Sequence, residues 1–195
     1  MVRSVPLRRP TTPTPLSFSP PPRVYLTGFM ASGKSTVGPL VADALGHRFV
    51  DLDWLVEARA GQSVEALFAA GGEAAFRAAE AAALAETTRG DGVVVATGGG
   101  ALVDPANLEL ARRAGVVVWL RTTPDVVLAR LGSAAGRPLL ADADGFPLCG
   151  DHLRGRVEGL MAARAPLYAR ADLTVDADAD APAVASAVVA ALRHS

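Results

Sequence analysis

The run of residues 28–36, GFMASGKST, constrains the fold of this chain more than any other part of its sequence. It fits the pattern GxxxxGK[ST], the P-loop, which binds phosphate groups where a β-strand turns sharply into an α-helix. Residues 23–27 are an apolar run of strand length, and residues 34–45 have a helical pattern that ends at Gly46. The sequence therefore predicts the strand, turn and helix that a phosphate-binding loop requires.

Each residue type in this loop has a physical purpose. Gly28 and Gly33 can adopt backbone angles closed to other residues, so the amides between them can turn toward an anion at the positive end of the helix. Lys34 is the only lysine among 19 basic residues, and its compact ammonium can reach between the β- and γ-phosphates. Ser35 offers a hydroxyl to Mg²⁺. The alternative is an ordinary glycine-rich turn with a solvated lysine, which the full pattern disfavours.

The rest of the chain alternates between short apolar runs and helical patterns. This alternation predicts an α/β fold with a five-stranded parallel sheet covered by helices on both faces. Ligands of such sheets bind at the carboxyl ends of the strands, where Gly28, Asp53 and Gly98 all fall. The predicted strands are residues 23–27, 47–53, 92–97, 116–120 and 173–175, and the predicted helices are residues 34–45, 63–70, 73–88, 107–114, 124–131, 152–168 and 183–193.

Composition disfavours several classes of partner. The net charge is -1 and the isoelectric point is near 6.3, so neither nucleic acid nor an anionic membrane is the expected main partner. No apolar stretch approaches the length needed to span a bilayer. The single cysteine, Cys149, can form no internal disulfide, which suits a reducing cytoplasm. We therefore expect a cytoplasmic protein, and nothing in the sequence demands more than a monomer.

Local composition divides the chain into an extension, a domain and a lid. Residues 1–22 hold seven of the 14 prolines, three arginines and no acid, so we expect a flexible extension. Residues 23–195 are long enough for one domain with a sizeable core. Residues 132–156 are rich in Gly, Pro and Asp and have little periodicity. A loop of that length within a compact domain predicts a functional lid.

Three further features concern the acceptor of the phosphoryl group. Asp51 and Asp53 alternate at strand spacing, so both carboxylates can face the same side of a strand end; the alternative is a helix N-cap followed by a solvated acid. Arg77 falls on a predicted helix and Arg164 in the run RAPLY, although each alone is more typical of a surface arginine. Three glycines, residues 98–100, follow an apolar strand directly and let the backbone approach a ligand closely.

Together these motifs resemble the shikimate kinase family over residues 23–195. Their order is GFMASGKST, DLD, FRxxE, TGGGA, RPLL and RAPLY. The resemblance implies a P-loop NTPase fold of the nucleoside-monophosphate-kinase type. It also implies an enzyme that transfers the γ-phosphoryl group of ATP to the 3-hydroxyl of shikimate. The products would be ADP and shikimate 3-phosphate, on the route to chorismate and the aromatic amino acids.

The same resemblance implies roles for residues near the phosphates. Lys34 neutralises the transferring phosphoryl group, and Ser35 ligates Mg²⁺ with Asp51 behind it. Asp53 matches the aspartate that binds the ring hydroxyl and is often proposed as the base. By likeness to the family, further ATP contacts come from the loop residues Ala31, Ser32, Gly33 and Thr36. Arg130 matches an arginine that stacks on adenine, and Arg137 matches an arginine that moves onto the phosphates with the lid.

The resemblance also implies how the acceptor is held. Shikimate is a small carboxylate, and Arg77 and Arg164 match the two arginines that grip it. The planar fork of arginine can hold a carboxylate through two parallel hydrogen bonds, which lysine cannot do. The backbone at Gly98, Gly99 and Gly100 is expected to hold the ring hydroxyls.

The chain departs from the family pattern in three places. The interval from Arg137 to Arg164 is several residues longer than expected, with residues 142–147 as the insertion. Ala31 stands where the family often has another glycine, and residues 176–182 lack a basic residue expected on the adenine side. We expect these departures to affect lid geometry and ATP affinity rather than the reaction.

Two alternative functions stay open at this point. Another small-molecule P-loop kinase, such as gluconate kinase, would keep the phosphate loop but need not pair Arg77 with Arg164 around a triple glycine. A nucleotide-binding module without catalysis is disfavoured because the full set of predicted phosphate-site residues is present. Release of ADP with shikimate but not with gluconate separates the three readings.

Overall fold

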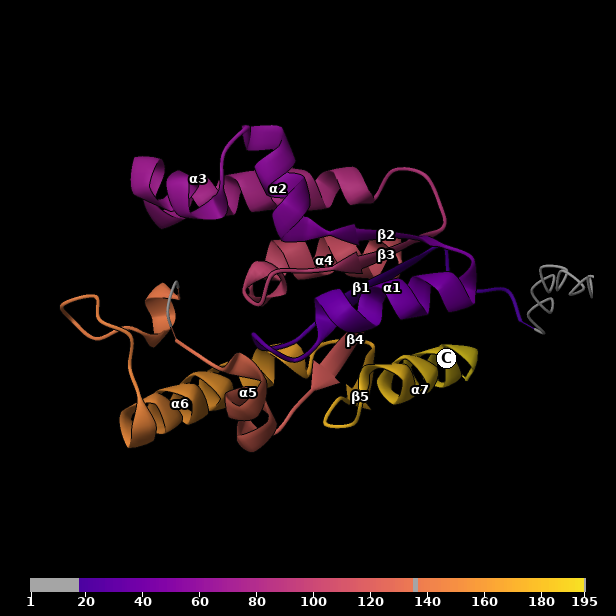
Figure 1. Cartoon of the computed structure of the whole chain (residues 1–195). Helices are drawn as coiled ribbons and strands as arrows, with labels where there is room; N and C mark the ends of the chain where they lie inside the picture. The colour runs from indigo at the N-terminus through magenta and orange to yellow at the C-terminus, as the bar shows by residue number, and fades with distance from the viewer. Residues whose placement is uncertain (1–17, 135–136, 195) are drawn as a thin grey trace, which may run out of the picture.

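The structure, a computed structural model, describes residues 18–134 and 137–194. Within these residues five parallel strands form one sheet in the order β2-β3-β1-β4-β5, which confirms the predicted fold class. Helices lie on both sides of the sheet, and the lid segment projects at one end (Figure 1). The strands are β1 (Arg23–Thr27), β2 (Arg48–Asp51), β3 (Val93–Ala96), β4 (Val116–Arg121) and β5 (Leu173–Asp176).

The helices of the described residues pack over three hydrophobic core clusters. None of them is long and apolar enough to cross a membrane. They are α1 (Lys34–Leu45), α2 (Leu52–Ala60), α3 (Val64–Thr87), α4 (Pro105–Ala114), α5 (Pro124–Leu131), α6 (Gly150–Tyr168) and α7 (Ala181–Arg193), with short 3-10 helices η1 (Ala101–Val103) and η2 (Pro138–Leu140). Val24 and Leu26 of β1 pack with α1 and α7, whereas Tyr25 between them packs with α2, α3 and α4. Because both faces of the sheet are buried, the strands appear in the sequence as continuous apolar runs.

The register of the sheet aligns the carboxyl ends of three strands. Ala96 of β3 pairs with Leu26 of β1 on one side and with Asp51 of β2 on the other. The P-loop follows β1, the triple glycine follows β3, and α2 follows β2. These three segments therefore begin side by side at one edge of the sheet, as expected for a parallel sheet that binds a ligand.

The turn after β2 corrects one expectation from the sequence. The sequence predicts a strand through Asp53, but β2 ends at Asp51 and Asp53 already lies in the first turn of α2, a helix that the sequence analysis did not predict. The Asp51 side chain caps this helix, since its Oδ1 accepts from the Asp53 N–H at 3.1 Å. The strand-spacing argument for the two carboxylates is therefore wrong, and the N-cap alternative holds for Asp51. In a stretch as short as residues 51–53, the sequence pattern of a strand end is the same as that of a helix N-cap followed by an acid.

The long helix α3 combines two predicted helices. The sequence predicts helices over residues 63–70 and 73–88, and α3 spans both with a break at Gly72 (φ 67°, ψ -169°). A positive φ of this size is readily adopted by glycine. The break changes the direction of the helix axis, so the second half of α3, which carries Arg77, is not collinear with the first half.

The lid, residues 132–156, contains more regular structure than its composition indicates. It includes η2 and the first turns of α6. Residues 142–147, where the sequence analysis expected an insertion, close on themselves: Asp142 N–H donates to the Phe146 carbonyl at 2.9 Å, and Asp142 Oδ1 accepts from the Phe146 N–H at 2.8 Å. Leu140, just before this turn, is fully buried in a cluster with Phe29 and Val157. Residues 142–147 therefore form a compact turn next to a buried anchor.

The chain before β1 is described only from Phe18 onward, so most of the predicted extension lies outside the described residues. The ring of Phe18 lies 5.3 Å from the guanidinium carbon of Arg193. The Pro22 carbonyl accepts from the Gly92 N–H at 2.8 Å. Residues 18–22 are thus in contact with the domain.

Candidate active site

The phosphate loop has the backbone that its glycines predict. Gly28 has φ 142°, and a Cβ on this residue would lie 2.6 Å from the Leu120 carbonyl oxygen, so both its angle and its surroundings require glycine. Gly33 has φ 96° and forms the N-cap of α1. Ala31 has φ 59°. Among the described residues it is the only one other than glycine with a positive φ. The loop therefore forms the turn that its pattern predicts, with strain at Ala31.

Lys34 is held beneath the loop. Its Nζ donates to the carbonyls of Gly28 at 2.9 Å and Phe29 at 2.8 Å, and to Ser32 Oγ at 3.2 Å. Lys34 is buried, and this burial lowers the pKa of its ammonium to about 8, although the carboxylates of Asp53 and Asp51 oppose the shift. The single lysine is thus a fixed positive charge at neutral pH on the floor of the loop.

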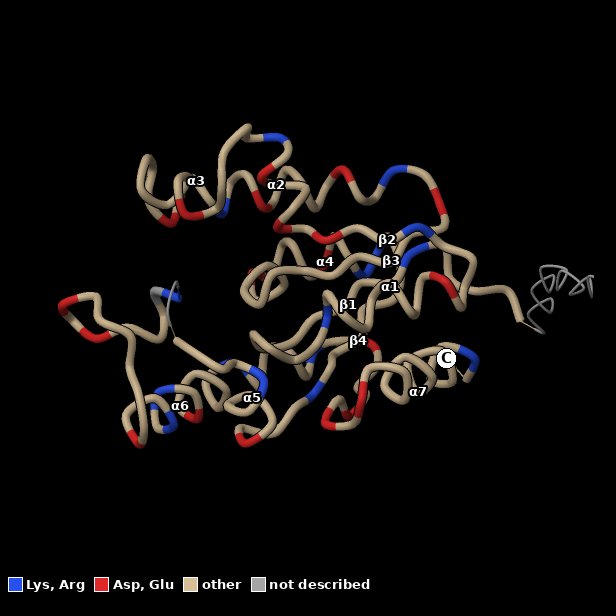
Figure 2. The backbone as a smooth tube through the Cα atoms, viewed as in Figure 1, with Lys and Arg blue, Asp and Glu red and all other residues tan. Residues whose placement is uncertain are grey.

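Ser35 and Asp51 join the start of α1 to the end of β2. Ser35 Oγ donates to Asp51 Oδ2 at 2.6 Å. Figure 2 shows acidic residues at this junction of β2 and α2. A hydroxyl and a carboxylate are hard oxygen ligands, and Mg²⁺ typically takes one or two such groups while keeping waters and binding substrate phosphates. The donor set therefore fits Mg²⁺ beside a bound nucleotide.

Asp53 and Glu80 approach the triple glycine together. A Cβ on Gly98 would lie 2.7 Å from Glu80 Oε1 and 3.0 Å from Asp53 Oδ1, so only glycine leaves room for both carboxylates. Burial raises the pKa of Asp53, and Asp51 adds to this, whereas Lys34 opposes it. Burial also raises the pKa of Glu80, against the effect of Arg77. Two carboxylates with raised affinity for protons therefore lie at the floor of this site.

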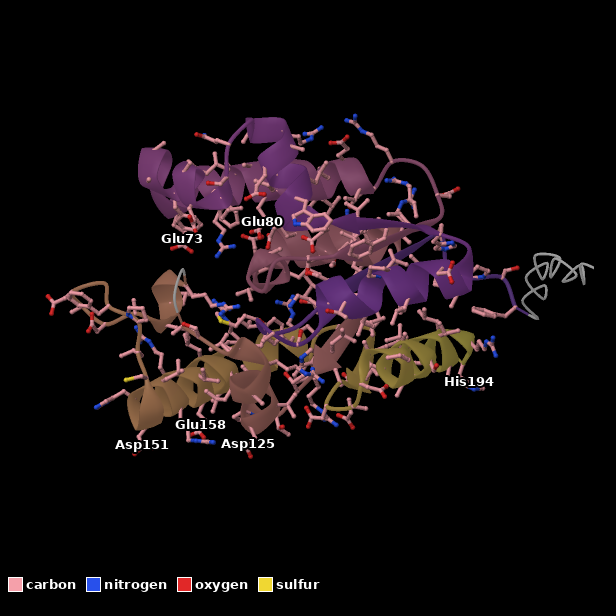
Figure 3. All side chains as sticks on the ribbon, viewed as in Figure 1. Glu73, Glu80, Asp125, Asp151, Glu158 and His194 are labelled. Atoms are coloured by element: carbon pink, nitrogen blue, oxygen red, sulfur yellow. The ribbon has the colours of Figure 1, made fainter. Side chains whose placement is uncertain are left out.

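Arg77 is positioned by two acids of its own helix. Its Nη1 donates to Glu80 Oε2 at 2.7 Å, and its Nη2 donates to Glu73 Oε1 at 3.3 Å. Both acids are labelled below α3 in Figure 3, on the side toward the P-loop. A Cβ on Gly100 would lie 2.8 Å from Arg77 Nη2, so the guanidinium rests directly against the third glycine. Arg77 therefore lies beside the triple glycine.

Glu80 is a site residue that the sequence analysis did not assign. Its side chain is 1% exposed, and its Oε1 has no hydrogen-bond partner in the described part of the chain. The sequence did contain a pattern that points to Glu80, because Glu80 is the acid of the run FRxxE and lies three residues after Arg77 on the same helix. That spacing also describes an ordinary surface ion pair, which is why the sequence alone did not reveal its burial.

Arg164 reaches the triple glycine from the opposite side. It comes from α6, and its Nη1 lies 3.5 Å from the Gly99 carbonyl oxygen. Its guanidinium carbon lies 5.9 Å from the ring of Phe29 in the P-loop. The backbone N–H groups of Gly99 and Gly100 have no hydrogen-bond partner among the described residues. The turn thus presents free donors between two arginines, an arrangement suited to an acidic polyol.

Arg130 and Thr36 border a second compartment beside the phosphate loop. Arg130 Nη1 donates to the Ala177 carbonyl and Nη2 to the Ala179 carbonyl, each at 2.8 Å. With Gly33 and Thr36 these residues line a cavity of about 190 Å³. The hydrogen bonds fix the guanidinium against the loop that follows β5, where the sequence analysis expected the adenine.

Arg137 lies in the lid and bonds to the lid itself. Its Nη1 donates to the Ser133 carbonyl at 2.6 Å and lies 3.5 Å from the Leu131 carbonyl. Its guanidinium makes no contact with the phosphate loop in the described residues. Of the predicted site residues, Arg137 is thus the one that the structure leaves apart from the rest.

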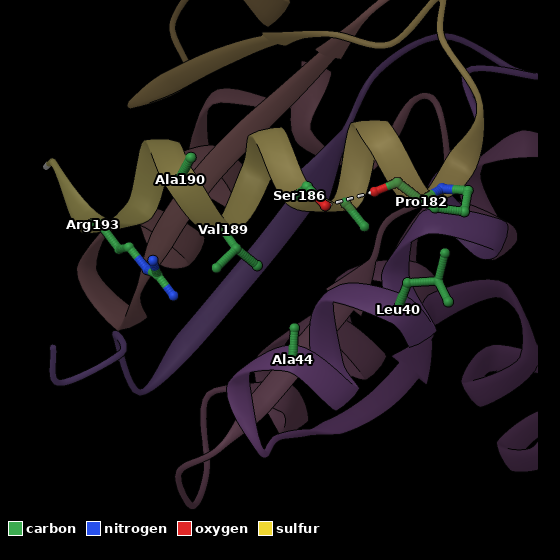
Figure 4. Close-up of a pocket in the computed structure, with 8 residues that line it drawn as sticks. Leu40, Ala44, Pro182, Ser186, Val189, Ala190 and Arg193 are labelled. Carbon is green, nitrogen blue, oxygen red and sulfur yellow. Dashed lines mark hydrogen bonds between the residues drawn. The ribbon is translucent and has the colours of Figure 1, made fainter. Parts of the chain in front are cut away.

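A further cavity lies away from these residues. It occupies about 390 Å³ between α1 and α7 and is lined mainly by apolar side chains, including Leu40 and Val189, with Arg193 at one end (Figure 4). It shares no residue with the cluster around Lys34. Apart from Arg193, its lining offers no charged side chain for a nucleotide or a carboxylate.

The chain is similar to known proteins over most of its length. A family model described as Shikimate kinase matches residues 30–193. A shikimate kinase of Salinibacter ruber is 49% identical over 170 residues, which cover 87% of this chain and 83% of that protein. A shikimate kinase of Halorhodospira halophila is 45% identical over 175 residues, which cover 89% of this chain and 94% of that protein.

Solved structures show the same relationship. A shikimate kinase of Acinetobacter baumannii in complex with shikimate has a TM-score of 0.77 and 33% identity, covering 86% of this chain and 90% of that chain. A gluconokinase of Sinorhizobium meliloti has a TM-score of 0.57 and 20% identity, covering 88% of this chain and 91% of that chain. At that level of identity the second likeness supports the shared fold alone.

Proposed function

The chain belongs to the shikimate kinase family and transfers the γ-phosphoryl group of ATP to the 3-hydroxyl of shikimate, and from this premise we propose which residues carry the reaction. The observation that supports the assignment best is the position of Arg77 and Arg164 on either side of the triple glycine, with Lys34 and Asp53 beside it. The gluconate kinase and non-catalytic alternatives are not favoured.

The P-loop binds the phosphates of ATP. Backbone amides of residues 31–36 surround the β-phosphate, and Lys34 contacts the γ-phosphoryl group that is transferred. The position of the buried ammonium supports this role, because Lys34 lies on the floor of the loop and can exchange the Gly28 and Phe29 carbonyls for phosphate oxygens when the nucleotide binds. Arg130 and Thr36 contact the adenosine part in the cavity after β5.

Ser35 and Asp51 would hold Mg²⁺ together with the nucleotide. The 2.6 Å hydrogen bond between them supports this role, because it orients the hydroxyl and places a carboxylate where it can accept from water on the ion. When bound, Mg²⁺ would neutralise charge on the β- and γ-phosphate oxygens.

Arg77 and Arg164 bind the carboxylate of shikimate. Arg77 approaches the turn at Gly100 and Arg164 approaches it at Gly99, which supports a bidentate contact from at least one of them. The free N–H groups of Gly99 and Gly100 donate to ring hydroxyls, with Gly98 giving the ring room to approach the carboxylates.

Asp53 orients the 3-hydroxyl and receives its proton. As the O–P bond to the 3-oxygen forms, the bond between the γ-phosphorus and the β,γ-bridging oxygen breaks and the proton passes to the carboxylate. The raised pKa of Asp53 supports the last step, because a carboxylate in a buried site accepts a proton more readily. Since the transition state of phosphoryl transfer is loose, orientation and charge neutralisation contribute most of the acceleration.

A lid and a single catalytic domain complete the proposed organisation of the chain. Residues 132–156 close over the nucleotide so that Arg137 exchanges the Ser133 carbonyl for phosphate oxygens. The enzyme works as a monomer in the cytoplasm, with residues 1–22 as an extension and residues 23–195 as the catalytic domain.

A coupled assay of ADP release tests the assignment. Purified protein should release ADP rapidly with ATP, Mg²⁺ and shikimate, and only slowly when shikimate is replaced by gluconate or Mg²⁺ is removed with EDTA. Equal or faster turnover with gluconate would overturn the acceptor. Full activity in EDTA would remove the role proposed for Ser35 and Asp51.

A further inference from the structure

Tyr168 is a buried polar residue that the proposed mechanism does not use. It is the last residue of α6 and is 4% exposed. Its Oη donates to the Gly99 carbonyl at 2.5 Å, and its ring lies 5.9 Å from that of Trp119. The hydroxyl therefore ends at the middle glycine of the acceptor turn.

Tyr168 and Arg164 act on the same atom. They are four residues apart on α6, so their side chains lie on one face of the helix. Arg164 Nη1 lies 3.5 Å from the same Gly99 carbonyl oxygen. Of the two, the tyrosine makes the shorter contact with the carbonyl, and the Arg164 guanidinium also interacts with the Tyr168 hydroxyl itself.

The hydrogen bond from Tyr168 orients the whole Gly99–Gly100 peptide and not only the Gly99 carbonyl oxygen. In a trans peptide, the carbonyl of Gly99 and the N–H of Gly100 lie in one plane and point in opposite directions. Fixing the carbonyl on the α6 side therefore fixes the direction of the Gly100 N–H, which has no hydrogen-bond partner among the described residues. A run of three glycines has no side chains of its own to prevent rotation of this peptide.

We propose that the Tyr168 hydroxyl is a positioning group for the acceptor: it holds the Gly99–Gly100 peptide so that the Gly100 N–H is directed at a ring hydroxyl of the acceptor. The inference rests on the proposed binding of shikimate at this turn. It assigns no contact between Tyr168 and shikimate. The tyrosine acts through Gly99.

The state of the phenol is compatible with this role. Burial raises the pKa of Tyr168, although the charge of Arg164 acts in the opposite direction. The hydroxyl is therefore protonated at neutral pH and can donate to the carbonyl. Phenylalanine would keep the ring against Trp119 and remove only this donor.

The test compares two variants that each remove one buried hydroxyl. The chain has two tyrosines, and Tyr25 lies in a different core cluster, where its hydroxyl accepts from Thr87 Oγ1 at 3.4 Å. Tyr168→Phe should raise the KM for shikimate about fivefold, the typical cost of one lost hydrogen bond, with the KM for ATP changed by less than about twofold. Tyr25→Phe should leave both KM values unchanged. Thermal melting of both variants reports any loss of stability.

Two results would overturn the inference. The first is an unchanged KM for shikimate in Tyr168→Phe. The second is a parallel rise of both KM values with a lowered Tm, because a general loosening of the domain affects both substrates. Arg164→Ala, measured alongside, tests the acceptor site itself: if it raises the KM for shikimate while Tyr168→Phe does not, only the role of Tyr168 fails. If neither variant changes that KM, the proposed acceptor site fails as well.

Discussion

Arg77 Nη1 lies 2.7 Å from Glu80 Oε2, so the guanidinium proposed to bind the acceptor is itself held by a carboxylate of the same helix. The two partners differ in their surroundings, because the Arg77 side chain is 37% exposed whereas that of Glu80 is 1% exposed. Glu80 therefore holds the pair from the protein interior, whereas Arg77 stays accessible to a ligand. Loss of the arginine has two separable consequences, one for binding and one for stability.

Arg77→Ala should raise the KM for shikimate by about 10- to 100-fold, as expected for a lost charge-assisted contact to a carboxylate. It should also lower the Tm, because Glu80 then stays buried without its partner. In the double variant Arg77→Ala with Glu80→Gln, the neutral amide should restore much of the Tm, whereas the KM should stay high. Steady-state kinetics and thermal melting measure the two effects. Recovery of the KM in the double variant would contradict a direct role for Arg77.

The close approach of Asp53 and Glu80 at Gly98 gives a second prediction. Gly98→Ala would place a Cβ 2.7 Å from Glu80 Oε1 and 3.0 Å from Asp53 Oδ1, so both carboxylates must shift. We expect kcat to fall by at least about 100-fold, because a displacement of about 1 Å has effects of that size on positioned groups. Gly159→Ala is the control, since its Cβ would find no atom within 4 Å and Gly159 lies on α6 outside the proposed site. If both variants lose kcat equally, crowding of the carboxylates is not the reason.

Features that depend on neighbouring residues in the sequence were predictable, whereas contacts between residues far apart in the sequence were not. The five strands and the P-loop were predictable because buried parallel strands and phosphate loops have local patterns. Asp53 was placed on a strand instead of in α2 because the spacing of Asp51 and Asp53 fits both a strand and a helix cap. The contact of Tyr168 with Gly99 joins residues 69 positions apart and leaves no local pattern. Burial of Glu80 likewise depends on the packing of α3 against the triple glycine.

The depressed pKa of Lys34 makes stability depend on pH in a defined direction. Its pKa is about 8 in the folded protein and 10.5 when unperturbed, so the unfolded chain binds more protons between these pH values. The free energy of unfolding should therefore rise with pH over this interval, by up to about 3 kcal/mol from this group. Subtracting the same curve for Lys34→Met removes titrations common to both proteins. A difference between the two that stays constant from pH 7 to pH 10 would show that the ammonium is not buried as described.

The same variant tests the chemical role of the lysine. Lys34→Met should lower kcat by at least about 100- to 1,000-fold, as expected when a charge that stabilises the transition state is removed. Its far-UV circular dichroism should match that of the unmodified protein, because the side chain is replaced by one of similar length. Near-normal kcat in a folded variant would contradict the assignment.

Ala31 gives the last prediction, because it holds a backbone angle that glycine adopts more easily. With φ 59°, an alanine is strained by about 1 kcal/mol, whereas glycine in the same place loses about 0.5–1 kcal/mol through the greater freedom of the unfolded chain. Ala31→Gly should therefore leave the free energy of unfolding nearly unchanged or slightly higher. Ala82→Gly, at an exposed position in the interior of α3, should lower it by about 1 kcal/mol, the usual cost of glycine in a helix. Urea denaturation of both variants measures the contrast. Since the loop already has the conformation that a glycine would allow, the KM for ATP should change by less than about threefold in Ala31→Gly. An equal loss of stability in the two variants would mean that the loop, when free of nucleotide, does not hold Ala31 at a positive φ.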